Sequence, residues 1–386
     1  MDTIDRHGLS TMLATLAERG YRVKGPVVQG GAVALGDLHD ADDLPAGVQD
    51  EQGPGRYRLH ETGGPALFDV TVPATAWKRY LHPPSLRLFR AERGENGGFE
   101  VVDDDEESPR YAFVGVRPCD LAAIHTLDRA RTGGPFVDAH YQRRRAGTFI
   151  VAVNCTRAGG TCFCDSMGTG PEAGEGYDLV LTELVDGAEH VFTVEAGSEV
   201  GAEVLAEVPH RESTAEEAEA VGAGIERAHG QMGRALPLDG VKELLEAHRD
   251  SDHWDGVGER CLACANCTMA CPTCFCTTVE DATDLAGDAA ERRQRWDSCF
   301  TTDFSYIHGG SVRPSTGTRY RQWITHKLAS WVDQFGEPGC VGCGRCITWC
   351  PVGIDITAEV AALRGDAAAA PVPAGDAAPA SKGGAA

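Results

Sequence analysis

The 386-residue sequence lacks the features of membrane and exported proteins. No uninterrupted apolar run approaches the roughly 20 residues that a membrane-spanning helix needs. The first twenty residues scatter Asp2, Asp5, Arg6 and Glu18 among apolar residues, which is unlike a secretory signal. The formal net charge of -23 argues against general binding to nucleic acid. We therefore expect a soluble cytoplasmic protein with no membrane insertion and no nucleic-acid partner.

The sequence also lacks the common nucleotide-binding motifs. No Gly-x-Gly-x-x-Gly follows a predicted strand, and no P-loop lysine is present. A glycine-rich stretch, Gly168-Thr-Gly-Pro, has no helix start behind it. A nucleotide site is therefore not predicted in this chain.

Cysteine, by contrast, is abundant and clustered. Fifteen cysteines are too many to be incidental and too few, in a chain this long, for a disulfide scaffold. Two segments, Cys261 to Pro272 and Cys340 to Pro351, each read Cys-x2-Cys-x2-Cys-x3-Cys-Pro. This spacing is the bacterial-ferredoxin signature for a pair of 4Fe-4S clusters, in which the fourth cysteine of each motif ligates the other cluster. Such grouping indicates metal ligation in a reducing compartment.

The signature predicts two ligand sets that share both motifs. We expect one cubane on Cys261, Cys264, Cys267 and Cys350, and the other on Cys340, Cys343, Cys346 and Cys271. Cross-ligation brings the two centres close together, as one-electron transfer requires. Structural zinc also takes paired Cys-x2-Cys ligands and is the alternative, but zinc requires neither the third evenly spaced thiol nor the trailing proline.

A second group of cysteines follows two predicted strands in the first half of the chain. Residues 112–116 and 148–154 read as buried strands, and residues 121–130 between them have helical spacing. Strand, helix, strand predicts a βαβ unit with a parallel pair. Cys119 and Cys155 then lie past the carboxyl ends of parallel strands, where open α/β sheets carry ligands. The next loop adds Cys162 and Cys164.

We expect a third 4Fe-4S cluster on these four residues, Cys119, Cys155, Cys162 and Cys164. Two other interpretations stay open. Free cysteine is among the most buried residue types, so Cys119 or Cys155 alone could belong to the core. A mononuclear zinc or a redox dithiol could use the same residues.

The remaining patterns predict an α+β protein. They indicate a helix over 4–19, short strands at 56–59 and 67–72, a hairpin over 177–194, helices within 198–249 and an amphipathic helix over 317–335. We therefore expect a mixed α/β domain at 1–250 with the candidate third cluster. A mainly helical, ferredoxin-like dicluster domain is expected at 251–364. The alanine, proline and glycine tail at 365–386 is predicted to be disordered.

Three cysteines remain outside these ligand sets. Cys274 and Cys276 lie in Pro-Thr-Cys-Phe-Cys, and Cys299 ends Trp-Asp-Ser-Cys. Burial near the clusters is the simpler interpretation, although a thiol or polysulfide site, or added metal contacts, would use the same residues. The region between the motifs also has a local basic bias, which comes from Arg292, Arg293, Arg295, Arg313, Arg319 and Arg321. These arginines could be solvated surface, or they could form a docking face or compensate the charge of anionic clusters.

Several phrases of the sequence resemble a known family. They are Gly115-Val-Arg-Pro-Cys-Asp120, Asn154-Cys-Thr, Gly160-Thr-Cys-Phe-Cys164, Cys271-Pro-Thr-Cys-Phe-Cys276, Trp296-Asp-Ser-Cys299 and Gly339-Cys-Val-Gly-Cys-Gly-Arg-Cys346. Together they resemble the iron-sulfur β subunit of cytoplasmic NiFe hydrogenases of the sulfhydrogenase type. The anaerobic sulfite reductase A subunit is similar in its dicluster half. The resemblance covers residues 110 to 360, matches 1–100 only loosely and does not reach the tail.

The resemblance implies a redox subunit that relays electrons within an oxidoreductase complex. In that family it lies between a flavin-bearing diaphorase subunit, which handles NAD(P)H, and the NiFe hydrogenase small subunit, which leads to the large subunit. The paired Cys-x2-Cys ligands of a NiFe centre have no counterpart here, so we expect no catalytic residue. The alternatives are the equivalent subunit of an anaerobic sulfite or sulfur reductase, a polysulfide-reducing enzyme that uses Cys274, Cys276 and Cys299, and a zinc-stabilised interaction module.

Overall fold

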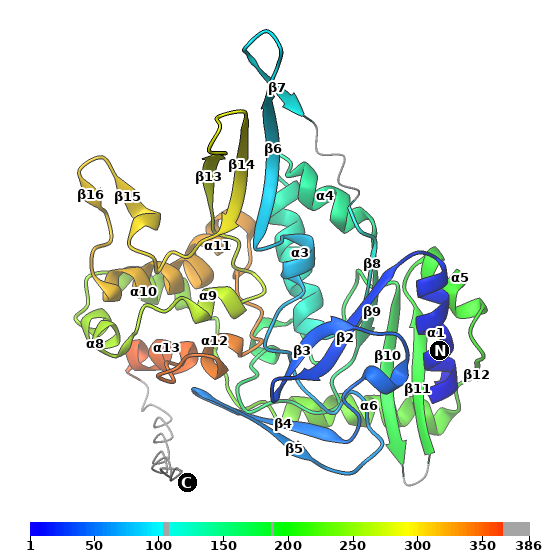
Figure 1. Ribbon diagram of the computed structural model, residues 1–386. Coiled ribbons are helices and arrows are strands. Elements are labelled where there is room, and N and C mark those ends of the chain that lie inside the picture. Colours follow the sequence, from blue (N-terminus) through cyan, green and yellow to red (C-terminus); the bar gives the residue numbers. More distant parts are fainter. Residues whose placement is uncertain (103–107, 187–188, 366–386) are drawn as a thin grey trace, which may run out of the picture.

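The computed structural model describes residues 1–102, 108–186 and 189–365. Figure 1 shows a large sheet with flanking helices beside a smaller, mostly helical part that contains the C-terminal third of the chain. Helices and sheets are both present, as the predicted α+β class requires. The tail predicted to be disordered lies, from residue 366 on, outside the described residues. In the described part of the chain, no helix is both long and apolar enough to cross a bilayer.

The large sheet has eight strands in the order β12-β1-β11-β10-β9-β8-β2-β3. Their bounds are β1 Asp2–Asp5, β2 Arg22–Gln29, β3 Ala32–Asp37, β8 Tyr111–Val116, β9 Thr148–Val153, β10 Leu179–Asp186, β11 Glu189–Ala196 and β12 Arg211–Glu212. The β2, β8, β9 and β10 strands run parallel, and the flanking strands are antiparallel. The predicted βαβ unit is confirmed, because α3 (Pro118–Thr132) connects the parallel pair β8 and β9. The hairpin predicted over 177–194 is confirmed as β10 and β11.

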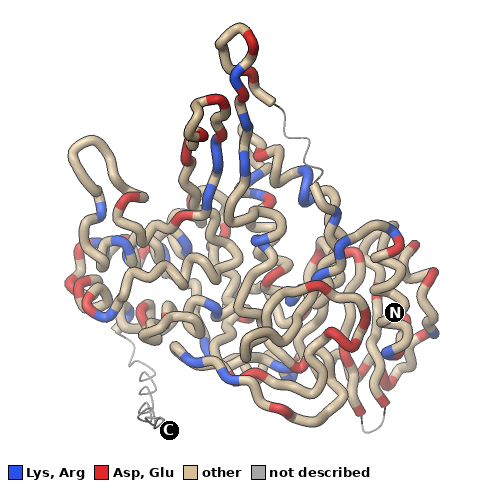
Figure 2. Tube along the Cα trace, viewed as in Figure 1, with Lys and Arg blue, Asp and Glu red and all other residues tan. Residues whose placement is uncertain are grey.

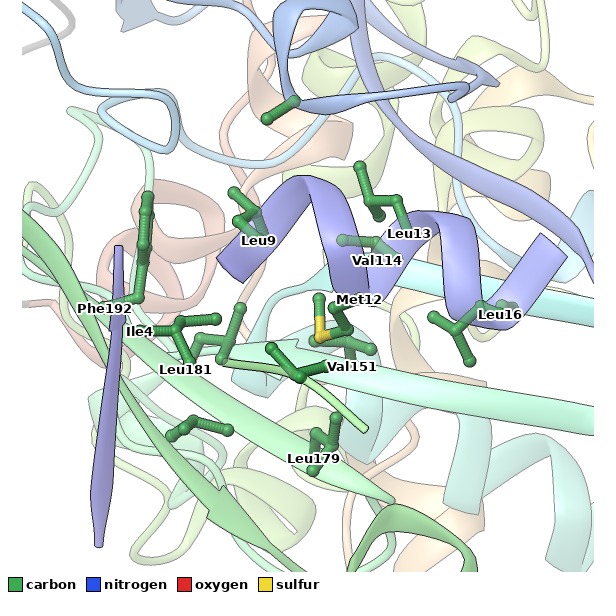
Figure 3. Packing of buried hydrophobic residues seen from close by; sticks show 14 of the residues in the cluster. Ile4, Leu9, Met12, Leu13, Leu16, Val114, Val151, Leu179, Leu181 and Phe192 are labelled. Atoms are coloured by element: carbon green, nitrogen blue, oxygen red, sulfur yellow. The ribbon is translucent and has the colours of Figure 1, made fainter. Parts of the chain in front are cut away.

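Both faces of this sheet are covered, which explains the continuous apolar runs in its central strands. On one face lies α1 (Arg6–Glu18), which buries Leu9, Met12 and Leu13 against Val114, Val151 and Leu181 of the strands (Figure 3). The Asp5 side chain caps its first turn. On the other face α3 packs Leu121, Ile124 and Leu127 against Phe113 and Ile150. The predicted opening helix is therefore confirmed from residue 6, while Ile4 belongs to the preceding strand.

The rest of the first 250 residues is shorter and less regular. It contains β4 Val48–Gly53, β5 Arg56–Glu61, α2 Lys78–Leu81, α4 Ala139–Ala146, α5 Glu199–Ala206, α6 Ala215–Gly230 and α7 Val241–Ala247. The strand expected at 56–59 and the helices expected within 198–249 are confirmed. The strand expected at 67–72 is wrong, because side chains rather than a neighbouring strand take its amides. The Glu183 carboxylate accepts from the amides of Leu67 and Phe68, and the Asp50 carboxylate from the amide of Thr71.

Helices surround the two cysteine motifs. They are α8 His253–Arg260, α9 Asn266–Ala270, α10 Thr316–Thr325, α11 Trp331–Phe335, α12 Arg345–Thr348 and α13 Ile356–Arg364. The amphipathic helix expected over 317–335 is confirmed as α10 and α11, joined by a π-helical turn, His326–Ser330. Its buried Tyr320, Trp323 and Ile324 share one core with Trp254 of α8 and Ile347 of α12.

A projecting four-stranded sheet was not predicted. Two hairpins form it in the order β13-β14-β6-β7: β13 Thr277–Thr283 with β14 Ala289–Trp296, and β6 Ser85–Arg93 with β7 Phe99–Val102. Figure 1 shows this sheet standing out from the body, and Figure 2 shows basic residues along β6 and β14. Much of the predicted basic bias is paired within the hairpin, since Arg292 binds Asp281 and Arg295 binds Glu280.

Candidate iron-sulfur sites

The two cysteine motifs adopt the same backbone conformation. In the first, Ala263 and Ala265 are left-handed, with φ of 51° and 65°. In the second, Gly342 and Gly344 occupy the equivalent positions, with φ of 62° and 75°. A short helix follows in each case, α9 or α12, and ends just before the fourth cysteine. A left-handed backbone conformation is energetically unfavourable for residues other than glycine. Alanine at both positions of the first motif therefore indicates that the surrounding structure holds the loop in this curved conformation.

The two loops differ in how deeply they are buried. Cys264 and Leu262 of the first loop are exposed. The second loop packs against the segment that carries Cys162 and Cys164. A Cβ on Gly342 would lie 2.5 Å from the Phe163 carbonyl oxygen, and one on Gly344 would overlap the Thr161 carbonyl oxygen. Glycine is therefore required in the buried loop for close approach as well as for its positive φ.

The structure brings the first predicted ligand set around one cavity. Cys261, Cys264, Cys267 and Cys350 all line it, together with Cys346 of the second set. The wall also includes Tyr320 and Trp323, and in the described part of the chain the Tyr320 hydroxyl and the Trp323 indole N–H are buried without a hydrogen-bond partner. Buried polar groups are rarely left unpaired. Four cysteines with two unsatisfied donors beside them fit a group that is rich in sulfur acceptors.

The second predicted ligand set is also brought together. Burial raises the pKa of Cys346, and Cys340, Cys343 and Cys271 lie close enough to raise it further. Lys327 is 4% exposed and its ammonium donates to Cys271 Sγ at 3.1 Å and to Thr273 Oγ1 at 3.0 Å. Among the described residues no carboxylate pairs with it. A buried cation needs a compensating anion, and a thiolate-ligated cluster would provide one.

The third predicted set adjoins the second. Cys119, Cys164 and Cys343 pack in one buried cluster, so the sheet edge and the second motif meet directly. Cys155 and Cys162 lie close enough to Cys164 to raise its pKa, which burial raises first. The Arg117 guanidinium lies 3.9 Å from Cys155 Sγ, and the Gly159 amide donates to Cys162 Sγ at 3.3 Å. All four cysteines therefore gather at the carboxyl edge of β8 and β9.

A buried ion pair that sequence reasoning missed connects this edge to the second motif. Both Arg345 guanidinium nitrogens reach the Asp120 carboxylate, at 2.8 and 2.9 Å, and Arg345 is fully buried. Arg345 also donates to the Pro73 carbonyl. Asp120 follows Cys119, and Arg345 lies between Cys343 and Cys346. Both residues stand inside the phrases quoted above, but their pairing across 225 positions leaves no local signal.

The three cysteines outside the ligand sets lie near Cys271, the last cysteine of the first motif, and near the base of the projecting sheet. The Cys274 side chain lies close to that of Cys271, and the Cys299 side chain lies close to that of Cys276. Among the described residues, no three Cys, His, Asp or Glu side chains converge closely enough to hold a single metal ion. The donor sets described above thus fit clusters through their cysteine content, their shared cavity and their buried cation.

Comparison with known proteins agrees with this chemistry. The family model for a 4Fe-4S dicluster domain matches residues 260–354. Over 304 residues the chain is 32% identical to the sulfhydrogenase 2 subunit beta of Pyrococcus furiosus, which covers 78% of this chain and 86% of that protein. No solved structure matches the chain. By this extent of identity the chain belongs to the sulfhydrogenase β-subunit family, with its 4Fe-4S dicluster domain in the C-terminal part.

Proposed function

We propose that this protein is the iron-sulfur electron-transfer subunit of an NAD(P)-linked NiFe hydrogenase complex. It would relay electrons between a flavin-bearing subunit, which binds NAD(P)H, and the hydrogenase small subunit. The observation that carries this proposal is the contiguity of the three cysteine sets. Cys343 packs against Cys119 and Cys164 of the third set, while Cys346 lines the cavity of the first.

The ligand assignment proposed here follows that contiguity. One cubane would be held by Cys261, Cys264, Cys267 and Cys350, and a second by Cys340, Cys343, Cys346 and Cys271. A third would be held by Cys119, Cys155, Cys162 and Cys164. When bound, such clusters supply one-electron carriers whose potentials depend on charge, hydrogen bonds and solvent exposure.

The chain's own residues support this role by setting exposure and charge. Aromatic side chains of α10 close the inner wall of the first cavity, whereas Leu262 on its outer side is 62% exposed. Electrons would therefore enter or leave at the first motif, where a partner can approach. The second set lies between the other two. Lys327 donates a hydrogen bond to Cys271 of this set, and Arg345, between Cys343 and Cys346 in the sequence, forms the buried ion pair with Asp120.

Metal analysis of anaerobically purified protein tests the cluster assignment. About twelve irons and twelve acid-labile sulfides per chain are expected for three cubanes, and about eight would remove the third. Cys164→Ser should lose about four irons while leaving the EPR signal of a coupled cluster pair after dithionite reduction. Colourless protein with bound zinc and no EPR signal would contradict the proposal.

Purification of a tagged chain from its native host tests the partners. We expect co-purified subunits that contain flavin and nickel, and NAD(P)H-dependent reduction of the clusters in that complex. A siroheme-containing partner instead of nickel would move the chain to the sulfite reductase assignment and contradict the hydrogenase one.

A further inference from the structure

A cavity of about 380 Å³ opens beside the first cysteine motif, outside the proposed ligand sets. Asn266 and Trp349 line it, and each directly precedes a cysteine of the first set. Its size lies within the range of about 300–1,000 Å³ that is usual for small-molecule sites. A ligand in this cavity would therefore lie next to the part of the chain that carries the first proposed cluster.

Two tryptophans give the cavity flat apolar surfaces, and residues outside the cavity hold both in place. The Tyr57 ring stacks on the Trp349 ring, with ring centroids 5.0 Å apart. The Trp296 indole N–H donates to the His82 carbonyl oxygen at 2.9 Å, and the Lys78 ammonium lies 4.3 Å from the centre of the indole ring. Because fixed aromatic side chains pack well against other planar rings, the cavity suits an aromatic ligand.

The same wall offers polar groups to a ligand. Thr75 lines the cavity, and its Oγ1 is buried without a hydrogen-bond partner in the described part of the chain. Buried polar groups are rarely left unpaired. Asn266 and Arg79 line the cavity as well, and both side chains are exposed. A planar ligand with hydrogen-bonding edges and an anionic group would use all three residues.

Arg79 connects this cavity to a second one. It also lines a cavity of about 460 Å³, and the adjacent prolines Pro84 and Pro83 line the first and the second cavity respectively. The two cavities therefore adjoin. The second cavity is a local concentration of positive charge in a chain whose net charge is -23, and its arginines are Arg22, Arg79, Arg87, Arg144 and Arg293.

Two of these arginines can receive an anion. Arg22 and Arg79 are exposed, and among the described residues no carboxylate pairs with either. The Arg79 guanidinium lies 5.6 Å from the centre of the Tyr80 ring, and the Tyr80 ring packs 5.1 Å from that of Tyr111. Guanidinium groups bind phosphate through two parallel hydrogen bonds. The second cavity therefore suits phosphate groups, with aromatic surface beside them.

We propose that the two adjoining cavities bind a flavin nucleotide. The isoalloxazine ring packs against Trp296 and Trp349, and the phosphate pairs with Arg79. In a dinucleotide, Arg22 takes the second phosphate. The choice of a flavin rests on the proposed function, because a flavin can exchange single electrons with an iron-sulfur centre, whereas a nicotinamide transfers hydride. Since the lining residues come from separate segments rather than from a glycine-rich loop, no sequence motif marks this site.

Equilibrium dialysis tests the site. Full-length, anaerobically purified protein is dialysed against FMN, FAD or riboflavin, and free flavin is measured by its fluorescence. We expect saturable binding of one FMN or FAD per chain, at least about tenfold tighter than that of riboflavin, which lacks the phosphate. An absence of saturable binding, or equal affinities for FMN and riboflavin, would overturn the proposal.

Substitution of Arg79 identifies the phosphate partner. Arg79→Gln should weaken the binding of FMN and FAD at least about tenfold and leave that of riboflavin unchanged. The matched control is Arg90→Gln, which removes an arginine of β6 that pairs with Glu92 outside both cavities and should change no affinity. An unchanged FMN affinity in Arg79→Gln would overturn the proposal.

Substitution of Arg22 distinguishes the two forms of the ligand. Tighter binding of FAD than of FMN, with the difference lost in Arg22→Gln, would support a dinucleotide that extends along the second cavity. Equal affinities for FAD and FMN would support a mononucleotide.

Substitution of Trp349 tests the position of the ring. Trp349→Leu should weaken the binding of FMN and of riboflavin alike, by roughly threefold to tenfold, because both carry the same ring. Unchanged affinities would overturn the placement of the ring beside the first motif.

Iron analysis of the same preparations separates this inference from the proposed function. Iron-loaded protein that binds no flavin would overturn the flavin site and leave the proposed function intact. Iron-free protein that binds FMN through Arg79 would contradict the proposed function while supporting the site.

Discussion

At the scale of single residues, Lys327 is placed to set a reduction potential. Its ammonium is buried and donates to Cys271 Sγ at 3.1 Å. A cation at this position stabilises the more negative, reduced form of a cluster bound there. Lys327→Met should therefore lower the midpoint potential of one cubane by on the order of 50 mV, about a tenfold change in its one-electron equilibrium. EPR-monitored redox titration measures it.

Two variants serve as controls for this prediction. Lys327→Arg keeps the charge and should keep the midpoint near its original value. Lys242→Met removes a lysine that pairs with Asp333 at the surface and should leave all midpoints unchanged. If Lys327→Met retained its iron and its original midpoints, Lys327 would have only a packing role.

The Asp120–Arg345 pair should be important for stability. Both side chains are at most 1% exposed, so removing one partner leaves an uncompensated buried charge. We expect Asp120→Ala to lower the free energy of unfolding by about 3–5 kcal/mol. Anaerobic urea unfolding followed by circular dichroism would measure it. The double variant Asp120→Leu with Arg345→Met removes both charges and should be less destabilised than Asp120→Ala. If it is equally unstable, geometry rather than charge pairing is what matters.

At the scale of elements, the two motif loops provide a matched comparison. Gly344→Ala places a Cβ onto the Thr161 carbonyl in a left-handed backbone, which by conformation alone costs roughly 1–2 kcal/mol. Ala265→Gly makes the reverse change at the equivalent position of the exposed loop and should be neutral or slightly stabilising. Thermal unfolding and iron content of the two variants test this contrast. Equal losses in both would mean that the packing against the Cys162 loop is not what demands glycine.

Elements with a periodic apolar pattern could be predicted from sequence, and others could not. The central strands β8 and β9 and the long helix over 316–335 follow directly from their buried residues. The β13–β14 hairpin was missed because its strands are polar and lack a clear apolar alternation. Its pairing with β6 joins residues about 200 positions apart, and such partners carry no local signal.

The same division applies to the candidate sites. Thiol spacing indicates which cysteines act together, because ligands of one cluster must reach a common centre. Spacing grouped the cysteines of the two motifs, and the βαβ topology placed the other four at one sheet edge, where the structure also has them. That each set holds a cluster stays a prediction. Lys327, Tyr320 and Arg345 were not identifiable, because each approaches the cysteines through tertiary packing. Such surrounding residues set potentials and stability, and only the fold shows them.

At the scale of the whole molecule, the two parts of the chain are joined by buried polar contacts, and one of them makes stability depend on pH. His82 follows the last residue of α2 and is 2% exposed. Its backbone carbonyl accepts a hydrogen bond from the Trp296 indole N–H of β14, and its ring accepts one from the Arg131 guanidinium of α3. Burial, followed by Arg131, lowers the pKa of His82 to about 3. The unfolded chain, with an ordinary histidine pKa near 6.5, therefore binds more protons than the folded chain between these values.

Stability should accordingly fall as the pH decreases from about 6.5 toward 3, and be unaffected by His82 above that range. Between pH 6.5 and pH 5 the expected loss in unfolding free energy from this residue is about 2 kcal/mol. His82→Gln supplies an acceptor for Arg131 without a titrating ring. Comparing urea midpoints of both proteins at pH 7.5 and pH 5 isolates the effect. The variant should be less sensitive to acid than the wild type, and parallel pH profiles would show that the His82 ring is already protonated in the folded protein.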